Sequence, residues 1–151
     1  MKQLPAGVQA PDFTLKTLDG RAFHLTEAVA AGPIALVFYK ASCPTCQLTF
    51  PYLQQIHSNS NALIVGISQD EPEETQAFVD RFGIAFDILI DEHPYDVSMV
   101  YGLQFVPTTF IIGKDGGIEL SDYGFSKATL STIAGFNVFP VDDGLPATRP
   151  G

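Results

Sequence analysis

The two cysteines of this chain lie within four residues, in the motif Cys43-Pro44-Thr45-Cys46. The motif follows an apolar run at 34–39, typical of a buried strand, and precedes a segment with helical spacing of apolar residues. Cys43 is therefore expected to cap a helix, with Pro44 in its first position, where the positive helix end favours a thiolate. We expect Cys43 to attack a disulfide and the deeper Cys46 to resolve the product. The Cys43–Cys46 disulfide is then the redox group, and no other cofactor is expected.

Two other roles for a cysteine pair compete with this one. A structural zinc site needs four ligands, but there is no further cysteine, and the histidines lie at the scattered positions 24, 57 and 93. An inert structural disulfide is the second alternative, and cytosolic disulfides are more often catalytic. We therefore expect no metal site.

The composition restricts the partners. The chain has 151 residues, 46% of them hydrophobic, which favours one globular domain. Eight Lys and Arg against 17 Asp and Glu give a net charge of −9, so we expect neither nucleic acid nor a membrane surface as partner. The longest apolar run, 33–39, is far shorter than the roughly 20 residues that cross a bilayer, and residues 1–12 hold no signal-peptide core. With Met1 as the native start, a cytoplasmic location is expected; an exported protein that has been trimmed would overturn this.

Glycine, proline and aspartate divide the chain into short elements. Residues 13–15 and 22–25 flank Asp19-Gly20 and predict a hairpin, followed by a brief helix that Thr26 would cap. The other predicted elements are strands at 34–39, 62–67, 86–90, 107–112 and 118–123, and helices from 44 to about 59, from 71 to Gly83, at 96–101 and from Ser126 to about 136. Early alternation of strand and helix implies parallel pairing, and the closing hairpin adds antiparallel edges. The predicted class is α/β, with a mixed central sheet and helices on both faces.

Several motifs in this order resemble a known superfamily. They are Ala10-Pro11-Asp12-Phe13-Thr14-Leu15, Asp19-Gly20, Phe38-Tyr39-Lys40-Ala41-Ser42-Cys43-Pro44-Thr45-Cys46 and Phe50-Pro51-Tyr52-Leu53. Over about residues 5–136 the pattern resembles the thioredoxin fold, and within it the alkyl hydroperoxide reductase/thiol-specific antioxidant (AhpC/TSA) and TlpA-like branch of thiol-disulfide oxidoreductases. The resemblance implies an N-terminal β-hairpin and an insertion of the TlpA or peroxiredoxin type at 86–104. We expect a thioredoxin-like domain at 1–137 and an irregular tail at 138–151, where Pro, Gly and Asp dominate.

The segment Val106-Pro107-Thr108 extends the resemblance. In the family, a proline at this place is cis and faces the cysteine pair, which the resemblance implies for Pro107. Val106 would offer backbone groups to an extended substrate peptide, with Pro44, Thr45 and Pro107 as the other substrate-binding residues. The simpler alternative is a proline that begins a strand, since it cannot donate to the ladder.

Two departures from the family pattern concern the proton of the deeper thiol. Thioredoxins bury an acid where this chain has Val37, and many TlpA-like reductases carry a glutamate where it has Thr49. Their absence predicts slower proton handling, or a hydroxyl or water in that role. Thr45 and Thr108 are candidates to hydrogen-bond the sulfurs. Lys40 is a candidate to favour the thiolate, with a solvated lysine at a strand end as an equal alternative.

Two other functions stay open. Peroxiredoxins use a Pro-x-x-x-Thr-x-x-Cys motif; before Cys46, the proline position holds Tyr39 and the threonine position holds Cys43, so peroxide reduction ranks second. A redox-silent binding module, with the tail as its interaction segment, ranks third. For the favoured function, the expected partner is a disulfide-containing protein or a small thiol. The sequence sets neither the direction of catalysis nor the upstream reductase or oxidant.

Overall fold

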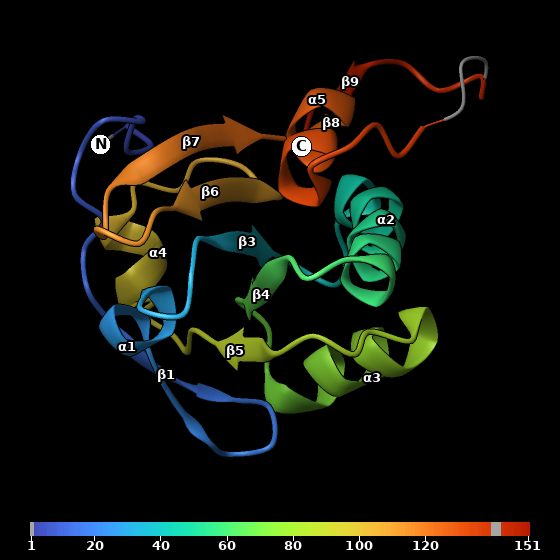
Figure 1. The fold of residues 1–151 in the computed structure, drawn as a ribbon. Helices are drawn as coiled ribbons and strands as arrows, with labels where there is room; N and C mark the ends of the chain where they lie inside the picture. Colours follow the sequence, from blue (N-terminus) through green and yellow to red (C-terminus); the bar gives the residue numbers. More distant parts are fainter. Residues whose placement is uncertain (1, 140–142) are drawn as a thin grey trace.

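The computed structural model describes residues 2–139 and 143–151 and is built on a seven-stranded sheet (Figure 1). Its strands are β1 (Thr14–Thr17), β2 (Ala22–His24), β3 (Ile34–Tyr39), β4 (Leu63–Ser68), β5 (Ile88–Ile90), β6 (Thr108–Ile112) and β7 (Ile118–Tyr123). The order across the sheet is β2-β1-β5-β4-β3-β6-β7. β3, β4 and β5 run parallel, whereas β1, β2, β6 and β7 join antiparallel at the two edges. The predicted mixed sheet and the N-terminal hairpin are confirmed.

Helices cover both faces of this sheet, as predicted. They are α1 (Leu25–Val29), α2 (Pro44–Asn59), α3 (Pro72–Phe82), α4 (Asp96–Val100) and α5 (Lys127–Ala134). Buried residues of α1 and α4 form one core cluster with Leu36 and Phe38, and those of α2, α3 and α5 form a second with Val37 and Tyr39. Alternate side chains of β3 enter opposite clusters because strand side chains alternate in direction. All six residues of β3 are buried, as expected for a central strand.

The helix that carries the cysteine motif continues past Pro51. α2 begins at Pro44, holds Pro51 in its interior and buries Leu53 and Ile56 beyond it. The apolar periodicity after the proline therefore predicts the helix correctly. No helix among the described residues is both long and apolar enough to cross a bilayer.

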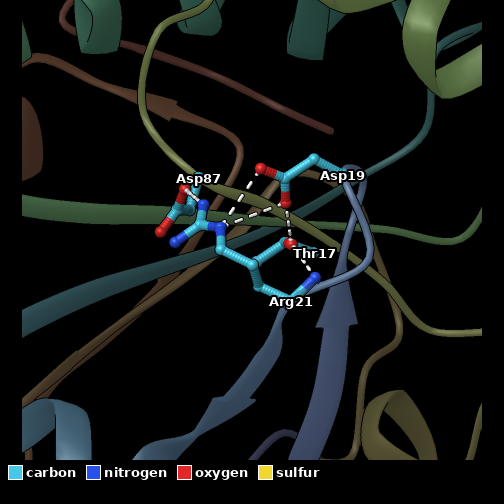
Figure 2. A network of polar contacts seen from close by, with 4 residues as sticks. All are labelled: Thr17, Asp19, Arg21 and Asp87. Atoms are coloured by element: carbon cyan, nitrogen blue, oxygen red, sulfur yellow. Dashed lines mark hydrogen bonds and ion pairs between the residues drawn. The ribbon is translucent and has the colours of Figure 1, made fainter.

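A polar network at the turn of the β1–β2 hairpin ties it to the neighbouring chain (Figure 2). The Thr17 hydroxyl donates to Asp19 and accepts the Arg21 backbone N–H at 2.9 Å. The Arg21 guanidinium pairs with Asp19 at 3.1 Å and with Asp87, just before β5, at 2.6 Å. The hydrogen bonds from Thr17 and Arg21 lower the pKa of Asp19. Because these pairs are exposed, they fix the position of the hairpin more than they add to stability.

The predicted start of the first helix is wrong. His24, not Thr26, occupies the N-cap of α1 and makes no side-chain cap bond. The Thr26 backbone N–H instead donates to Asp12 Oδ1 at 3.1 Å. The Asp12 carboxylate, which precedes the hairpin in the sequence, thus accepts a backbone N–H at the start of the helix in place of a local cap residue. Local sequence rules do not reveal a partner that is this distant in the chain.

The end of the chain returns to the domain. Of the predicted tail at 138–151, residues 140–142 lie outside the described residues. Beyond them, β9 (Thr148–Arg149) pairs antiparallel with β8 (Phe125–Ser126), so the described tail is not irregular throughout. The boundary at 137/138 stays a prediction. So does the insertion at 86–104, which holds β5 and α4.

Candidate redox site

The two cysteines occupy the N-terminus of α2 in the predicted order of depth. Cys43 is the N-cap residue, and its Sγ accepts the Cys46 backbone N–H at 3.1 Å. Cys43 is half-buried, whereas Cys46 is fully buried, and both thiols are free. The Cys43 sulfur is therefore the accessible one of the pair, and the Cys46 sulfur lies deeper in the protein.

The depth of Cys46 controls its protonation. Burial raises the pKa of the Cys46 thiol well above its ordinary value, and the hydrogen bond with Cys43 raises it further, while a backbone hydrogen bond from Lys40 acts in the opposite direction. Cys46 therefore stays a neutral thiol at neutral pH. Any attack by Cys46 requires that its proton leave first.

The raised pKa of Cys46 predicts that the reduced protein loses stability above about pH 8.5, the ordinary pKa of a cysteine. Below that pH both states keep the proton. Above it the unfolded chain loses the proton and the folded chain keeps it, so unfolding becomes easier. We expect the free energy of unfolding to fall by roughly 1 kcal/mol between about pH 7.5 and about pH 9.5.

Urea unfolding under reducing conditions measures this loss, with Cys46→Ala as the control that removes the titrating group. Burial also raises the pKa values of Tyr39 and Tyr101, but tyrosines in an unfolded chain ionise near pH 10 and act mainly above this window. An equal pH slope in Cys46→Ala would contradict the assignment to Cys46.

The loop before β6 faces the cysteine pair. The Val106–Pro107 peptide bond is cis, as the resemblance implied. The Cys43 thiol donates to the Val106 carbonyl oxygen at 3.4 Å. On the other side, Gly124 N–H donates to the Pro107 carbonyl at 2.8 Å, and the buried Thr108 hydroxyl donates to Phe105 O at 2.6 Å. The loop is thus fixed on both sides of the position that meets Cys43.

The threonines use their hydroxyl protons away from the sulfurs. Thr45 Oγ1 donates to the Pro150 carbonyl at 2.7 Å, and Thr49 Oγ1 donates to the Thr45 carbonyl at 2.8 Å. Because a hydroxyl has one proton to donate, neither Thr45 nor Thr108 donates to a sulfur here, and their predicted hydrogen bonding to the thiols stays a prediction. The Lys40 side chain is exposed, and its backbone carbonyl accepts the Cys43 N–H at 3.2 Å. A role for its ammonium in tuning the thiolate stays a prediction.

Sequence reasoning missed two groups near the site. Asp70 Oδ2 accepts the Ala41 N–H at 2.6 Å and so holds the segment that leads to Cys43. The parallel register pairs Tyr39 with Ser68, which places the residues two positions further along, 41 and 70, next to each other. The Tyr39 hydroxyl is the second group: it is buried and has no hydrogen-bond partner among the described residues.

No cluster of three or more metal-binding side chains is present in the described part of the chain. The Cys43 sulfur lies against the Val106 carbonyl oxygen and the Cys46 backbone N–H.

A mixed sheet with helices on both faces, a Cys-x-x-Cys pair at the start of a helix and a cis-proline loop facing it define a thioredoxin-fold protein with a dithiol site. The AhpC/TSA family profile matches residues 6–121, and the chain belongs to this family.

Three comparisons give the family context. The thiol-disulfide oxidoreductase ResA of Halalkalibacterium halodurans is 35% identical over 117 residues, which are 75% of this chain and 65% of that protein. A Helicobacter pylori protein with the name peroxiredoxin bcp is 31% identical over 137 residues, covering 82% of this chain and 90% of that one. A crystal structure from Chlorobium tepidum, of a protein described as thiol:disulfide interchange protein DsbE, superimposes with a TM-score of 0.76 at 23% identity, covering 88% and 95% of the two chains. This chain thus spans just under two thirds of the length of ResA, and the DsbE likeness shows the fold.

Proposed function

We propose that the protein is a thiol-disulfide oxidoreductase that exchanges electrons with protein or small disulfides through Cys43 and Cys46. One observation carries the proposal: the half-buried Cys43 sulfur lies 3.4 Å from the Val106 carbonyl of the cis-proline loop, with the buried Cys46 behind it. The name of the ResA relative supports the same activity.

The reaction consists of two exchanges. Cys43 attacks a substrate disulfide as a thiolate, a mixed disulfide forms, and one substrate sulfur leaves as a thiol. Cys46 then loses its proton and attacks the Cys43 sulfur, which releases the second substrate sulfur. The substrate gains two electrons, and the protein is left with the Cys43–Cys46 disulfide. The same steps in reverse oxidise a dithiol.

The second exchange is the slower one in this proposal. Cys46 is fully buried, and neither Val37 nor Thr49 provides a carboxylate to take its proton. The Thr49 hydroxyl is bonded to the Thr45 carbonyl instead. The rate of substrate release should therefore rise more steeply with pH than the rate at which Cys43 attacks the substrate disulfide.

The cysteine pair is itself the redox group, so no cofactor or metal takes part. Partners are a disulfide-containing protein or a small thiol, together with an upstream reductant or oxidant that restores the pair. We place the protein in the cytoplasm, and cell fractionation tests that location.

Peroxide reduction is the second candidate, because the Helicobacter pylori relative has the name of a peroxiredoxin. In a peroxiredoxin motif the reacting cysteine would be Cys46, which is fully buried, whereas Cys43 is the half-buried thiol. The depth of the two sulfurs therefore favours disulfide exchange. Peroxide consumption that depends on Cys46 would reverse this ranking.

Trapping with Cys46→Ser tests the proposed function. Without Cys46 the mixed disulfide on Cys43 is not resolved, so a protein disulfide substrate should accumulate as a covalent adduct on non-reducing gels. Cys43→Ser is the matched control and should form no adduct. The absence of an adduct, together with no reaction of the native protein with a small disulfide, would reject the proposal. Unchanged partner binding by a Cys43→Ser/Cys46→Ser double variant would then favour a redox-silent binding module.

A further inference from the structure

The last described segment of the chain, residues 147–151, runs across the redox site. Its first half joins β8: Lys127 N–H donates to the Ala147 carbonyl at 2.9 Å, and the β8–β9 ladder follows. Its second half reaches the cysteine motif, where Thr45 Oγ1 donates to the Pro150 carbonyl at 2.7 Å. Figure 1 shows this end of the chain beside β8.

The backbone of this segment lies directly against the cis-proline loop. A β-carbon at Gly151 would collide with the Val106 carbonyl oxygen, so glycine fits here because it has no side chain. Gly124, at a φ of 77°, faces the Arg149 carbonyl in a similarly close approach. The Val106 carbonyl that accepts the Cys43 thiol is thus the carbonyl that Gly151 covers.

A separate anchor holds the segment that leads into the site. Lys127 Nζ pairs with Asp143 at 2.7 Å and donates to the Leu145 carbonyl at 3.0 Å. Both side chains of the pair are mostly buried, and Lys127 lowers the pKa of Asp143. Because the anchor lies outside the cysteine site, it tethers residues 147–151 close to the cis-proline loop. A tethered segment has an effective concentration of the order of millimolar, even when its own contacts are weak.

We propose that residues 147–151 are an intramolecular occupant of the peptide-binding groove formed by Thr45, Val106, Gly124 and β8, and that a protein substrate must displace them. The inference rests on the proposed function, and it names the substrate form: an extended peptide segment next to a disulfide, bound through its backbone. A small disulfide needs little more than access to the half-buried Cys43, flanked by the exposed Ser42 and Pro44. The segment therefore restrains reaction with proteins more than with small disulfides.

Deletion of residues 147–151 tests the restraint. We expect the second-order rate constant for a protein disulfide such as insulin to rise about tenfold, because the groove is then open in every molecule. The rate constant for a small disulfide should change little. Arg149→Ala is the matched control, since it removes an exposed side chain but leaves the backbone in place, and it should behave as the native chain. Gly151→Val, in which the new side chain meets Val106, should shift the rates in the same direction as the deletion and does not depend on the folding of a shortened chain.

A binding measurement separates the groove from the chemistry. A fluorescent peptide with the sequence of residues 144–151 should bind the protein that lacks residues 147–151, and its fluorescence anisotropy should rise on binding. The bound peptide should slow the reaction of the shortened protein with the protein disulfide, whereas a scrambled peptide should do neither. No peptide binding together with an unchanged rate, or a slower protein reaction after deletion, would overturn the inference. Peptide binding by a protein that reacts with no disulfide would overturn the proposed function, but it would support the inference that residues 147–151 occupy a peptide-binding groove.

Discussion

Replacing Cys43 with serine is expected to lower the second-order rate constant for disulfide reduction by at least about 10³-fold, because a serine hydroxyl is not ionised near neutral pH and forms no mixed disulfide. The position of the thiol gives the physical reason. Cys43 is the half-buried sulfur of the pair, at the cap of α2 and in contact with the cis-proline loop. Reduction of a protein disulfide, with a chemical reductant that regenerates the pair, measures the effect.

Two further variants serve as controls for the loss of activity in Cys43→Ser. Ser42→Ala changes the exposed neighbour of Cys43 and should leave the rate nearly native. Cys46→Ser should retain the first exchange, visible as a single release of substrate thiol, and lose turnover. If Cys43→Ser kept more than about a tenth of the native rate constant, the reaction would not begin at Cys43, and the proposed order of the two sulfurs would be wrong.

The sequence predicts those parts of the fold that depend on neighbouring residues. β3 has the predicted bounds because a continuous apolar run between Pro33 and the cysteine motif fits a strand buried on both faces. Gly83 ends α3 in the left-handed conformation, as a glycine after a helix often does. The cap of α1 was missed because its partner, Asp12, lies on the far side of the hairpin. A local pattern cannot indicate a bond whose two ends meet through tertiary structure.

The same distinction applies to the site. The cysteine motif carries its own geometry, since a helix start places Cys46 N–H against the Cys43 sulfur within four residues. The hydrogen-bond acceptors of the threonine hydroxyls, in contrast, depend on tertiary structure. Thr108 donates to a loop carbonyl, and Thr45 donates to the carbonyl of Pro150, 105 residues further along. Nothing in a Pro- and Gly-rich tail indicates that it returns to the cysteines.

Replacing Phe50 with alanine is expected to give the largest loss of stability, about 3–5 kcal/mol, because it empties the centre of a buried aromatic cluster. Phe50 has no exposed surface, and its ring centroid lies 4.3 Å from that of Tyr39, 5.3 Å from Phe78 and 6.0 Å from Phe86. Since small domains unfold at a cost of about 5–15 kcal/mol, a loss of this size is a large share of the total. Urea unfolding near neutral pH measures it. Phe136→Ala is the control: the residue is 50% exposed, so its replacement should lower the free energy of unfolding by less than about 0.5 kcal/mol.

The Phe50 variant also links the core to the redox chemistry. Phe50 follows Cys46 by four residues on α2, so the two side chains share a helix face and the same buried cluster. A cavity at Phe50 reduces the desolvation that raises the pKa of Cys46, so that pKa should return toward its ordinary value. An NMR titration of the Cys46 side chain in the folded, reduced protein should then show ionisation at a lower pH in Phe50→Ala than in the native chain. An unchanged pKa of Cys46 would show that the Cys43 contact, rather than packing around α2, keeps the proton on Cys46.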